Sequence, residues 1–256
     1  MPSSARLLLP LALLMTGLPL AARAGNSTVV AVGVGMQRMP AWPGSRHQRE
    51  DPLPYIDIEL PGIGSLSTVD GLEVELLHGQ ALRGGFYGSY QWGREHGDLG
   101  PLGGIVPSLS PRLTAGGYLE WQLDKAVDVG ANLSHDMAGA GAYLNLYADA
   151  DLPSIGPLQQ SASVRLALMN GAAMNRFFGL GPVTATALGV HAWHPGAGSE
   201  MASLEYDLYL PTSQHTGVAL AVTYGRLLGG AANSPLVSRF GSTTQWSQSL
   251  AFIYHP

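Results

Sequence analysis

The sequence contains no cysteine among its 256 residues, which excludes disulfide bonds, thiolate metal ligands and a cysteine nucleophile. Charged residues are scarce, at 12% of the chain. The 13 basic residues are outnumbered by 18 acidic ones and form no clustered basic surface, so nucleic acid is not an expected partner. Beyond residue 24 no run of about 18 apolar residues occurs, which argues against a transmembrane helix there.

The first 24 residues have the features of a secretory signal peptide. Arg6 precedes an apolar segment at residues 7–20, and residues 22–24 form an A-x-A cleavage site. A retained membrane anchor is disfavoured because the apolar run is short and interrupted by two prolines. We therefore expect a signal peptide at residues 1–24 and one mature domain at residues 25–256. Without Arg6 and Arg23, 11 basic residues face 18 acidic ones, a net charge of about −7.

Residues 30–60 set the pattern for the rest of the chain. Val32 and Val34 alternate with Gly33 and Gly35, as in a β-strand, and residues 55–60 alternate aliphatic with polar or charged side chains. Two such strands would suit a soluble sandwich, in which the apolar faces pack together. A transmembrane barrel instead turns apolar residues toward lipid and small or polar residues toward the lumen. The face rich in glycine and alanine favours the barrel.

Further alternating segments continue along the chain. They lie at residues 72–76, 86–92, 118–123, 127–133, 143–149, 162–168, 187–193, 201–210, 217–227 and 245–254. With the first two, they predict an all-β fold, an antiparallel transmembrane β-barrel of about 12 strands, with a range of about 10–14. In this count the long connections 94–112 and 170–185 fall where short periplasmic turns belong, so one or two strands are expected to be misassigned.

Three stretches of the chain resemble one protein family. The run VGVGMQRMPAWPGSRHQREDPLPYIDIEL at residues 32–60 resembles the N-terminal signature of the MipA/OmpV family of Gram-negative outer-membrane proteins. RFFGL at residues 176–180 and the C-terminal stretch at residues 224–254, with its SPLV element, are similar to later parts of the same family. The matching positions are Pro40, Trp42, Gly44, Ser45, Pro54, Tyr55, Phe178, Gly179, Ser234 and Pro235.

The resemblance implies a location and a function. MipA-like proteins are outer-membrane scaffolds that bring an MltA-type lytic transglycosylase together with a bifunctional penicillin-binding protein, and OmpV-like relatives are antigens with roles in adhesion or osmotic response. The leading hypothesis is therefore a non-enzymatic scaffold for peptidoglycan (murein) synthesis and remodelling, in contact with outer-membrane lipid. A small pore or an adhesin is the alternative. The resemblance supplies no catalytic residue, cofactor or metal, and its matching positions describe the fold.

Arg46, His47, Arg49 and Glu50 form the most charged loop that the sequence predicts. A solvated loop is the simpler interpretation. The functional interpretation is a contact for a partner or for lipopolysaccharide, because the arginine fork matches phosphate oxygens.

Two other groups of residues have the types that hydrolysis requires. Asp57 and Glu59, like Glu73 and Glu75, lie two residues apart on one strand face, about 7 Å from each other. They suit either an acid and base pair or, more simply, an acidic lumen wall that faces arginines such as Arg165. Ser134-His135-Asp136, the second group, is not expected to form a triad, because adjacent strand residues face opposite ways; we expect a turn there. A barrel hydrolase is thus a third hypothesis.

Overall fold

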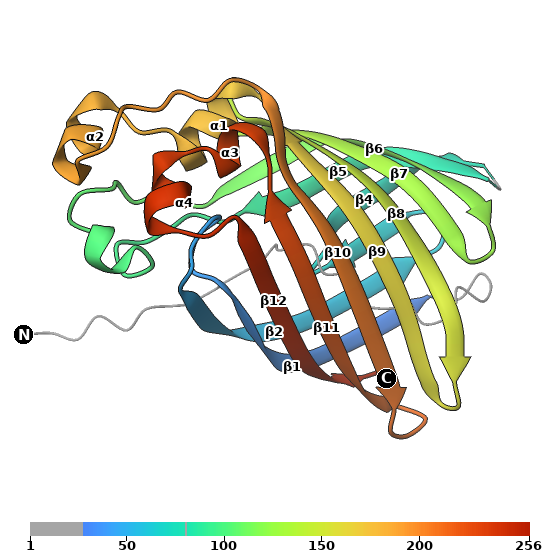
Figure 1. The fold of residues 1–256 in the computed structure, drawn as a ribbon. Helices are drawn as coiled ribbons and strands as arrows, with labels where there is room; N and C mark the ends of the chain where they lie inside the picture. The colour runs from blue at the N-terminus through green and yellow to red at the C-terminus, as the bar shows by residue number, and fades with distance from the viewer. Residues whose placement is uncertain (1–27, 80) are drawn as a thin grey trace, which may run out of the picture.

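The computed structural model of the chain describes residues 28–79 and 81–256, and the expected signal peptide lies outside them. In the described part, twelve strands form one closed antiparallel barrel in which neighbours in sequence pair and β12 pairs with β1 (Figure 1). The strands are β1 (Val29–Pro40), β2 (Gln48–Leu60), β3 (Gly64–Ser67), β4 (Gly71–His78), β5 (Leu82–Gln91), β6 (Arg112–Asp124), β7 (Val127–Asp136), β8 (Ala142–Ile155), β9 (Leu158–Met169), β10 (Gly198–Pro211), β11 (Thr216–Leu227) and β12 (Thr244–Tyr254). The prediction of an all-β barrel of about 12 strands is confirmed.

Alternation along each strand separates an apolar outer surface from the lumen. On β1, Val34 is exposed on the outside, whereas Ala31 is buried inside. The other strands repeat this division, with exposed outer side chains that include Ile56, Leu72, Phe86, Leu119, Leu133, Leu146, Val164, Leu204, Leu220 and Leu250. Closure gives every strand a neighbour on both sides, as a barrel in lipid requires.

The barrel closes where β1 pairs with β12, from Val32 opposite Tyr254 to Arg38 opposite Gln248. Gly33 and Gly35 face the lumen at this seam. A Cβ atom at either glycine would lie 2.3 Å from a carbonyl oxygen of β12. The alternating glycines of the N-terminal stretch therefore allow the two ends of the sheet to approach closely.

The strand count was right because two errors cancel. Residues 64–67 form β3, a strand that the sequence analysis missed because GSLS is short and lacks a run of aliphatic residues. Residues 187–193 do not form the expected strand: Pro182 begins a helix that ends at Leu188, and a loop follows. With β3 in place, both long connections move to the same end of the barrel, which resolves the conflict in the predicted topology.

The two ends of the barrel differ. One end has short turns, including residues 61–63, 125–126, 156–157 and 212–215. The other end carries the long connections and their helices (Figure 1), which are η1 (Gly100–Leu102), α1 (Gly171–Phe178), α2 (Pro182–Leu188), α3 (Gly229–Ala232) and α4 (Pro235–Phe240). None of the described helices is long and apolar enough to cross a membrane. By the rule that outer-membrane barrels turn short connections to the periplasm, we expect the helical end to face outward.

Candidate functional site

Two cavities lined by the described residues differ in chemistry. The acidic cavity, of about 390 Å³, extends to the short turns and is lined there by Leu60, Pro61 and Lys125. The cap cavity, of about 140 Å³, lies below the helices and is lined there by Trp42 and Phe177. Tyr87 and Arg165 line both cavities and so mark the border between them.

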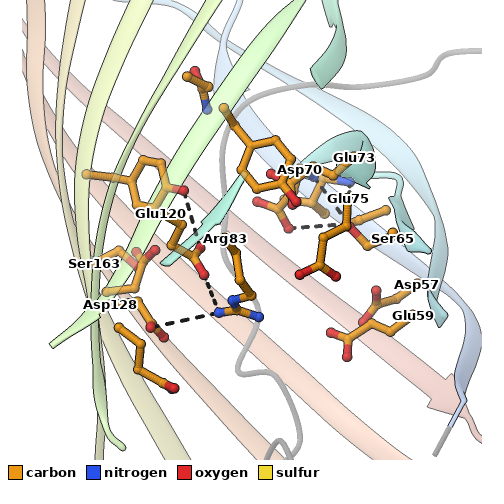
Figure 2. Close-up of a pocket in the computed structure, with 18 of the residues that line it drawn as sticks. Asp57, Glu59, Ser65, Asp70, Glu73, Glu75, Arg83, Glu120, Asp128 and Ser163 are labelled. Atoms are coloured by element: carbon orange, nitrogen blue, oxygen red, sulfur yellow. Dashed lines mark hydrogen bonds and ion pairs between the residues drawn. The ribbon is translucent and has the colours of Figure 1, made fainter. Parts of the chain in front are cut away.

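Acidic side chains dominate the acidic cavity (Figure 2). Its charged lining comprises three cations, Arg83, Lys125 and Arg165, and nine carboxylates, Asp57, Glu59, Asp70, Glu73, Glu75, Glu120, Asp128, Asp149 and Asp151. Such an excess of negative charge between low-dielectric walls attracts cations. The two predicted carboxylate pairs on β2 and β4 are both in this lining, which confirms their assignment to an acidic lumen wall.

Ion pairs within the wall hold part of this charge in place. The Arg83 guanidinium pairs with Glu120, and its Nη2 atom lies 3.9 Å from Oδ1 of Asp128 (Figure 2). The Tyr147 hydroxyl donates a hydrogen bond of 3.3 Å to the second oxygen of Glu120. Neighbouring strands β5, β6, β7 and β8 are thereby linked on the lumen side.

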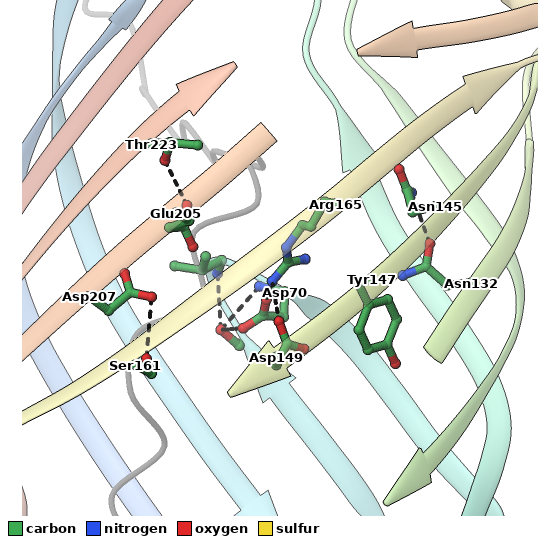
Figure 3. Close-up of polar contacts among 12 residues, drawn as sticks. Asp70, Asn132, Asn145, Tyr147, Asp149, Ser161, Arg165, Glu205, Asp207 and Thr223 are labelled. Atoms are coloured by element: carbon green, nitrogen blue, oxygen red, sulfur yellow. Dashed lines mark hydrogen bonds and ion pairs between the residues drawn. The ribbon is translucent and has the colours of Figure 1, made fainter. Parts of the chain in front are cut away.

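Arg165 of β9 projects into the centre of the lumen (Figure 3). Its Nη2 atom lies 3.9 Å from Asp70 Oδ1 and 4.0 Å from Asp149 Oδ1, and its guanidinium lies 5.9 Å from the centre of the Tyr147 ring. Asp70 belongs to the turn between β3 and β4, so Arg165 connects opposite walls. The sequence analysis expected Arg165 to face the carboxylate pairs of β2 and β4, but its partners are Asp70 and Asp149. The short β3 hairpin is what brings Asp70 to this position.

Hydrophobic packing closes the helical end. The buried cluster there draws on the β1–β2 loop, the 92–111 connection and the helices, and contains Trp42, Leu99, Val106, Met174, Phe177, Phe178, Leu180, Leu236 and Val237. Arg94 fastens the 92–111 connection to α1 through a 2.8 Å hydrogen bond to the Phe177 carbonyl. Burial and the nearby Arg176 guanidinium lower the pKa of Arg94 to about 10. Nothing in the sequence around Arg94 had indicated this role.

Most of the matching positions of the family resemblance meet in this cap. Ser234 begins α4: its hydroxyl donates a 2.6 Å hydrogen bond to the Phe178 carbonyl and accepts the Leu236 N–H. Pro235 follows at the first helical position, and Gly179 ends α1, where a Cβ atom would lie 2.4 Å from the Asn175 carbonyl oxygen. Three stretches far apart in sequence are therefore one structural unit.

The β1–β2 loop joins the cap through Gly44. Its φ of +99° favours glycine, and a Cβ atom there would lie 2.6 Å from Val237 Cγ2. Its N–H donates a 3.0 Å hydrogen bond to Gln245 Oε1. Pro40 precedes this loop at the end of β1, Trp42 and Ser45 are buried within it, and Pro54 and Tyr55 lie apart from the cap on β2.

The four residues of the predicted charged loop do not share one surface. β2 begins at Gln48, so Arg49 and Glu50 are strand residues. Arg46 and His47 are exposed, and Arg46 donates hydrogen bonds to the carbonyls of Arg239 and Gly241. Glu50 is exposed, and its Oε1 atom lies 3.9 Å from Nε of Arg38.

Arg49 instead points inward and spans a gap in the strand pairing. β3 pairs with only residues 57–60 of β2, so within the described chain residues 48–55 of β2 pair only with β1. Beside this gap, Arg49 forms ion pairs of 2.9 Å with Asp51 and 3.3 Å with Asp98. Its guanidinium also lies 4.8 Å from the centre of the Trp92 ring, just beyond β5.

The residues considered for hydrolysis do not assemble into a triad. Residues 134–136 belong to β7 and not to the turn that we expected, because pairing with β6 continues to Asp136. Ser134 and Asp136 are buried, whereas His135 is exposed on the opposite face, as alternation predicts. Among the described residues, no group of three or more histidine, aspartate or glutamate side chains could hold a metal ion.

A family model and several solved structures match the chain. A family model described as "MltA-interacting protein MipA" matches residues 32–256. A solved structure titled "Bacterial polysaccharide outer membrane secretin" is similar over 89% of this chain and 98% of that chain, with 7% identity and a TM-score of 0.45. The NanC porin is similar over 89% and 99%, with 8% identity and a TM-score of 0.47. No curated protein matches the chain. Because the family model spans nearly all of the barrel, this outer-membrane β-barrel belongs to the MipA family.

Proposed function

We propose that this barrel is a non-enzymatic scaffold of the outer membrane that binds an MltA-type lytic transglycosylase and, with it, a bifunctional penicillin-binding protein. The observation that carries the proposal is the family match over residues 32–256, whose description names an interaction with MltA. The proposal includes export: cleavage of residues 1–24 would leave Gly25 as the first residue of the mature protein, which N-terminal sequencing of the outer-membrane form tests.

The short-turn end is the surface that we assign to the transglycosylase. Murein lies on the periplasmic side, and short turns of outer-membrane barrels face that side. Two aliphatic side chains at this end are well exposed, Ile63 at 61% and Ile155 at 66%. Each lies in or beside a short turn, so substitution of both residues tests this surface.

Direct binding tests the scaffold. The mature barrel, immobilised in detergent, is titrated with the MltA-type transglycosylase of the same organism by surface plasmon resonance, and we expect saturable binding in the micromolar range or tighter. Replacing both Ile63 and Ile155 with serine is expected to weaken binding at least about fivefold. The matched control is Val183→Ser, because Val183 is 86% exposed on α2 at the opposite end. A folded barrel that binds no transglycosylase would refute the proposal.

The acidic cavity favours a second candidate, a small cation-conducting pore. Packing of the cap cluster across the helical end opposes a wide channel. Conductance of the mature protein in planar bilayers distinguishes the two, since a lumen that stays closed at all voltages would exclude the pore.

At the outer face, we propose the exposed Arg46, His47 and Glu50 as the part of the charged loop that contacts lipopolysaccharide or a partner; an adhesin would use this same face. Loss of lipopolysaccharide binding in Arg46→Gln would support this contact, and unchanged binding would exclude it.

A further inference from the structure

The cap cavity contains a carboxylate in an unusual position. Glu200 is near the start of β10, where the pairing with β9 shifts: Ser199 pairs with Leu168, and Met201 pairs with the next residue, Ala167. Glu200 is therefore the extra residue of a β-bulge. Adjacent residues of a regular strand face opposite sides, but Glu200 and Met201 both line the cap cavity. The bulge thus turns a glutamate inward, and bulges re-aim side chains in this way beside functional sites.

Charge pairing distinguishes Glu200 from the other charged residues of this cavity, Arg49 and Arg165. Arg49 forms ion pairs with Asp51 and Asp98, and Arg165 with Asp70 and Asp149. The Glu200 carboxylate forms no hydrogen bond or ion pair within residues 28–79 and 81–256. Glu200 is partly exposed in a largely apolar cavity, and a carboxylate without a partner in such surroundings attracts a cation.

The remaining walls suit an organic cation. Trp42, Trp92, Tyr143 and Phe177 line the cavity, and aromatic faces attract ammonium groups. The volume of about 140 Å³ is close to that of cavities that hold a single aromatic ring.

The neighbouring acidic cavity favours the same charge. The acidic cavity extends from the short-turn end to Tyr87 and Arg165, which also line the cap cavity. Its nine carboxylates and three cations concentrate cationic solutes and repel anions. At the border, the charge of Arg165 is balanced by Asp70 and Asp149.

From this geometry we propose that the cap cavity is a binding site for a small organic ammonium ion with one ring-sized apolar group. The ammonium pairs with Glu200, and the apolar group lies among the aromatic walls. The site is independent of the proposed scaffold function.

The test compares a charged probe with a neutral one. The barrel, purified from outer membranes in detergent, is titrated with benzylammonium and with benzyl alcohol by calorimetry. We expect the wild type to bind benzylammonium about tenfold more tightly than benzyl alcohol, because a charge-assisted pair adds to the shared apolar contact. Failure of the wild type to bind benzylammonium would overturn the proposal, as would equal affinity for the two probes.

Two charge-removing variants locate the ammonium. Glu200→Gln keeps the shape of the side chain and is expected to lose the tenfold preference while binding benzyl alcohol unchanged. Glu75→Gln is the matched control, since it removes one carboxylate from the acidic cavity, and it is expected to keep the preference. If Glu75→Gln loses the preference and Glu200→Gln keeps it, the ammonium binds in the acidic cavity and the proposal is wrong.

A third variant tests the cavity itself without changing Glu200. Ala167 is buried on the lumen side of β9 and lines the cap cavity. Ala167→Leu places a larger side chain there and is expected to weaken the binding of both probes to a similar extent. A heat-dependent shift in gel mobility shows that the variant barrel is folded. Unchanged binding of both probes would show that they bind outside the cap cavity and would overturn the proposal. This test does not require the Glu200→Gln variant to fold.

Discussion

The acidic cavity and the cap cavity belong to one lumen but depend on different parts of the chain. Strands with alternating side chains build most of the acidic cavity, so its carboxylates follow directly from local sequence. The cap depends on connections, whose side chains meet only through contacts between distant segments, such as that of Ser234 with Phe178. A barrel wall can therefore be specified strand by strand, whereas the closure of its end cannot.

The largest expected effect comes from breaking the cap. Phe178 is fully buried in the cap, and Phe178→Ala would leave a cavity that costs about 3–5 kcal/mol. We expect rapid proteolysis of the 170–197 connection while the barrel keeps its heat-dependent gel mobility. The matched control is Phe86→Ala, on the outer surface with 62% exposure, which should leave the proteolysis rate unchanged. Equal protection of both variants would contradict the separation of cap and wall.

A smaller effect is expected at the border between the cavities. Arg165→Met leaves Asp70 and Asp149 without their shared cation, and we expect it to lower the free energy of unfolding by about 1–3 kcal/mol. The loss is smaller than for a fully buried ion pair because both carboxylates are partly exposed. Urea unfolding in detergent measures it, and a second substitution, Asp70→Asn, should restore part of the loss. Arg38→Met is the control, since the Arg38–Glu50 pair is exposed and contributes little. No difference between these two arginine variants would count against the central role of Arg165.

The smallest effect is expected at the start of α4. Ser234→Ala removes the helix cap and the hydrogen bond to the Phe178 carbonyl, which should cost about 1 kcal/mol and loosen the cap slightly. Ser238→Ala, on the exposed side of the same helix, is the comparison. The rate of cap proteolysis in Ser234→Ala should lie between the rates in the wild type and in Phe178→Ala. A rate equal to that of Ser238→Ala would show that Ser234 does not stabilise the cap.

Sequence alone predicted the wall because each strand carries its own alternating signal. Residues 30–60 sufficed for two strands and for the direction of their faces. The two errors have opposite causes. β3 is only four residues long and lacks this signal, whereas residues 187–193 alternate although a helix ends and a loop begins there. Both errors concern short segments whose structure is decided by their surroundings.

The functional features were less accessible to sequence reasoning. The inward direction of Arg49 follows from the early start of β2 at Gln48, which extends the alternation of Tyr55 into residues that the sequence analysis assigned to a loop. The bulge at Glu200 depends on a register shift between β9 and β10, and no residue type in the segment predicts it. The meeting of Trp42, Phe178 and Ser234 in one cap follows only from the closed topology.

The hydrogen bond between Gly44 and Gln245 joins positions 201 residues apart, one from the first hairpin and one from the last strand. During assembly this bond can form only after the first and last strands have found each other. A fully formed cap therefore indicates that the barrel has closed. A ligand or antibody that recognises the cap near Gly44 would thus distinguish finished barrels from assembly intermediates whose strands are already paired.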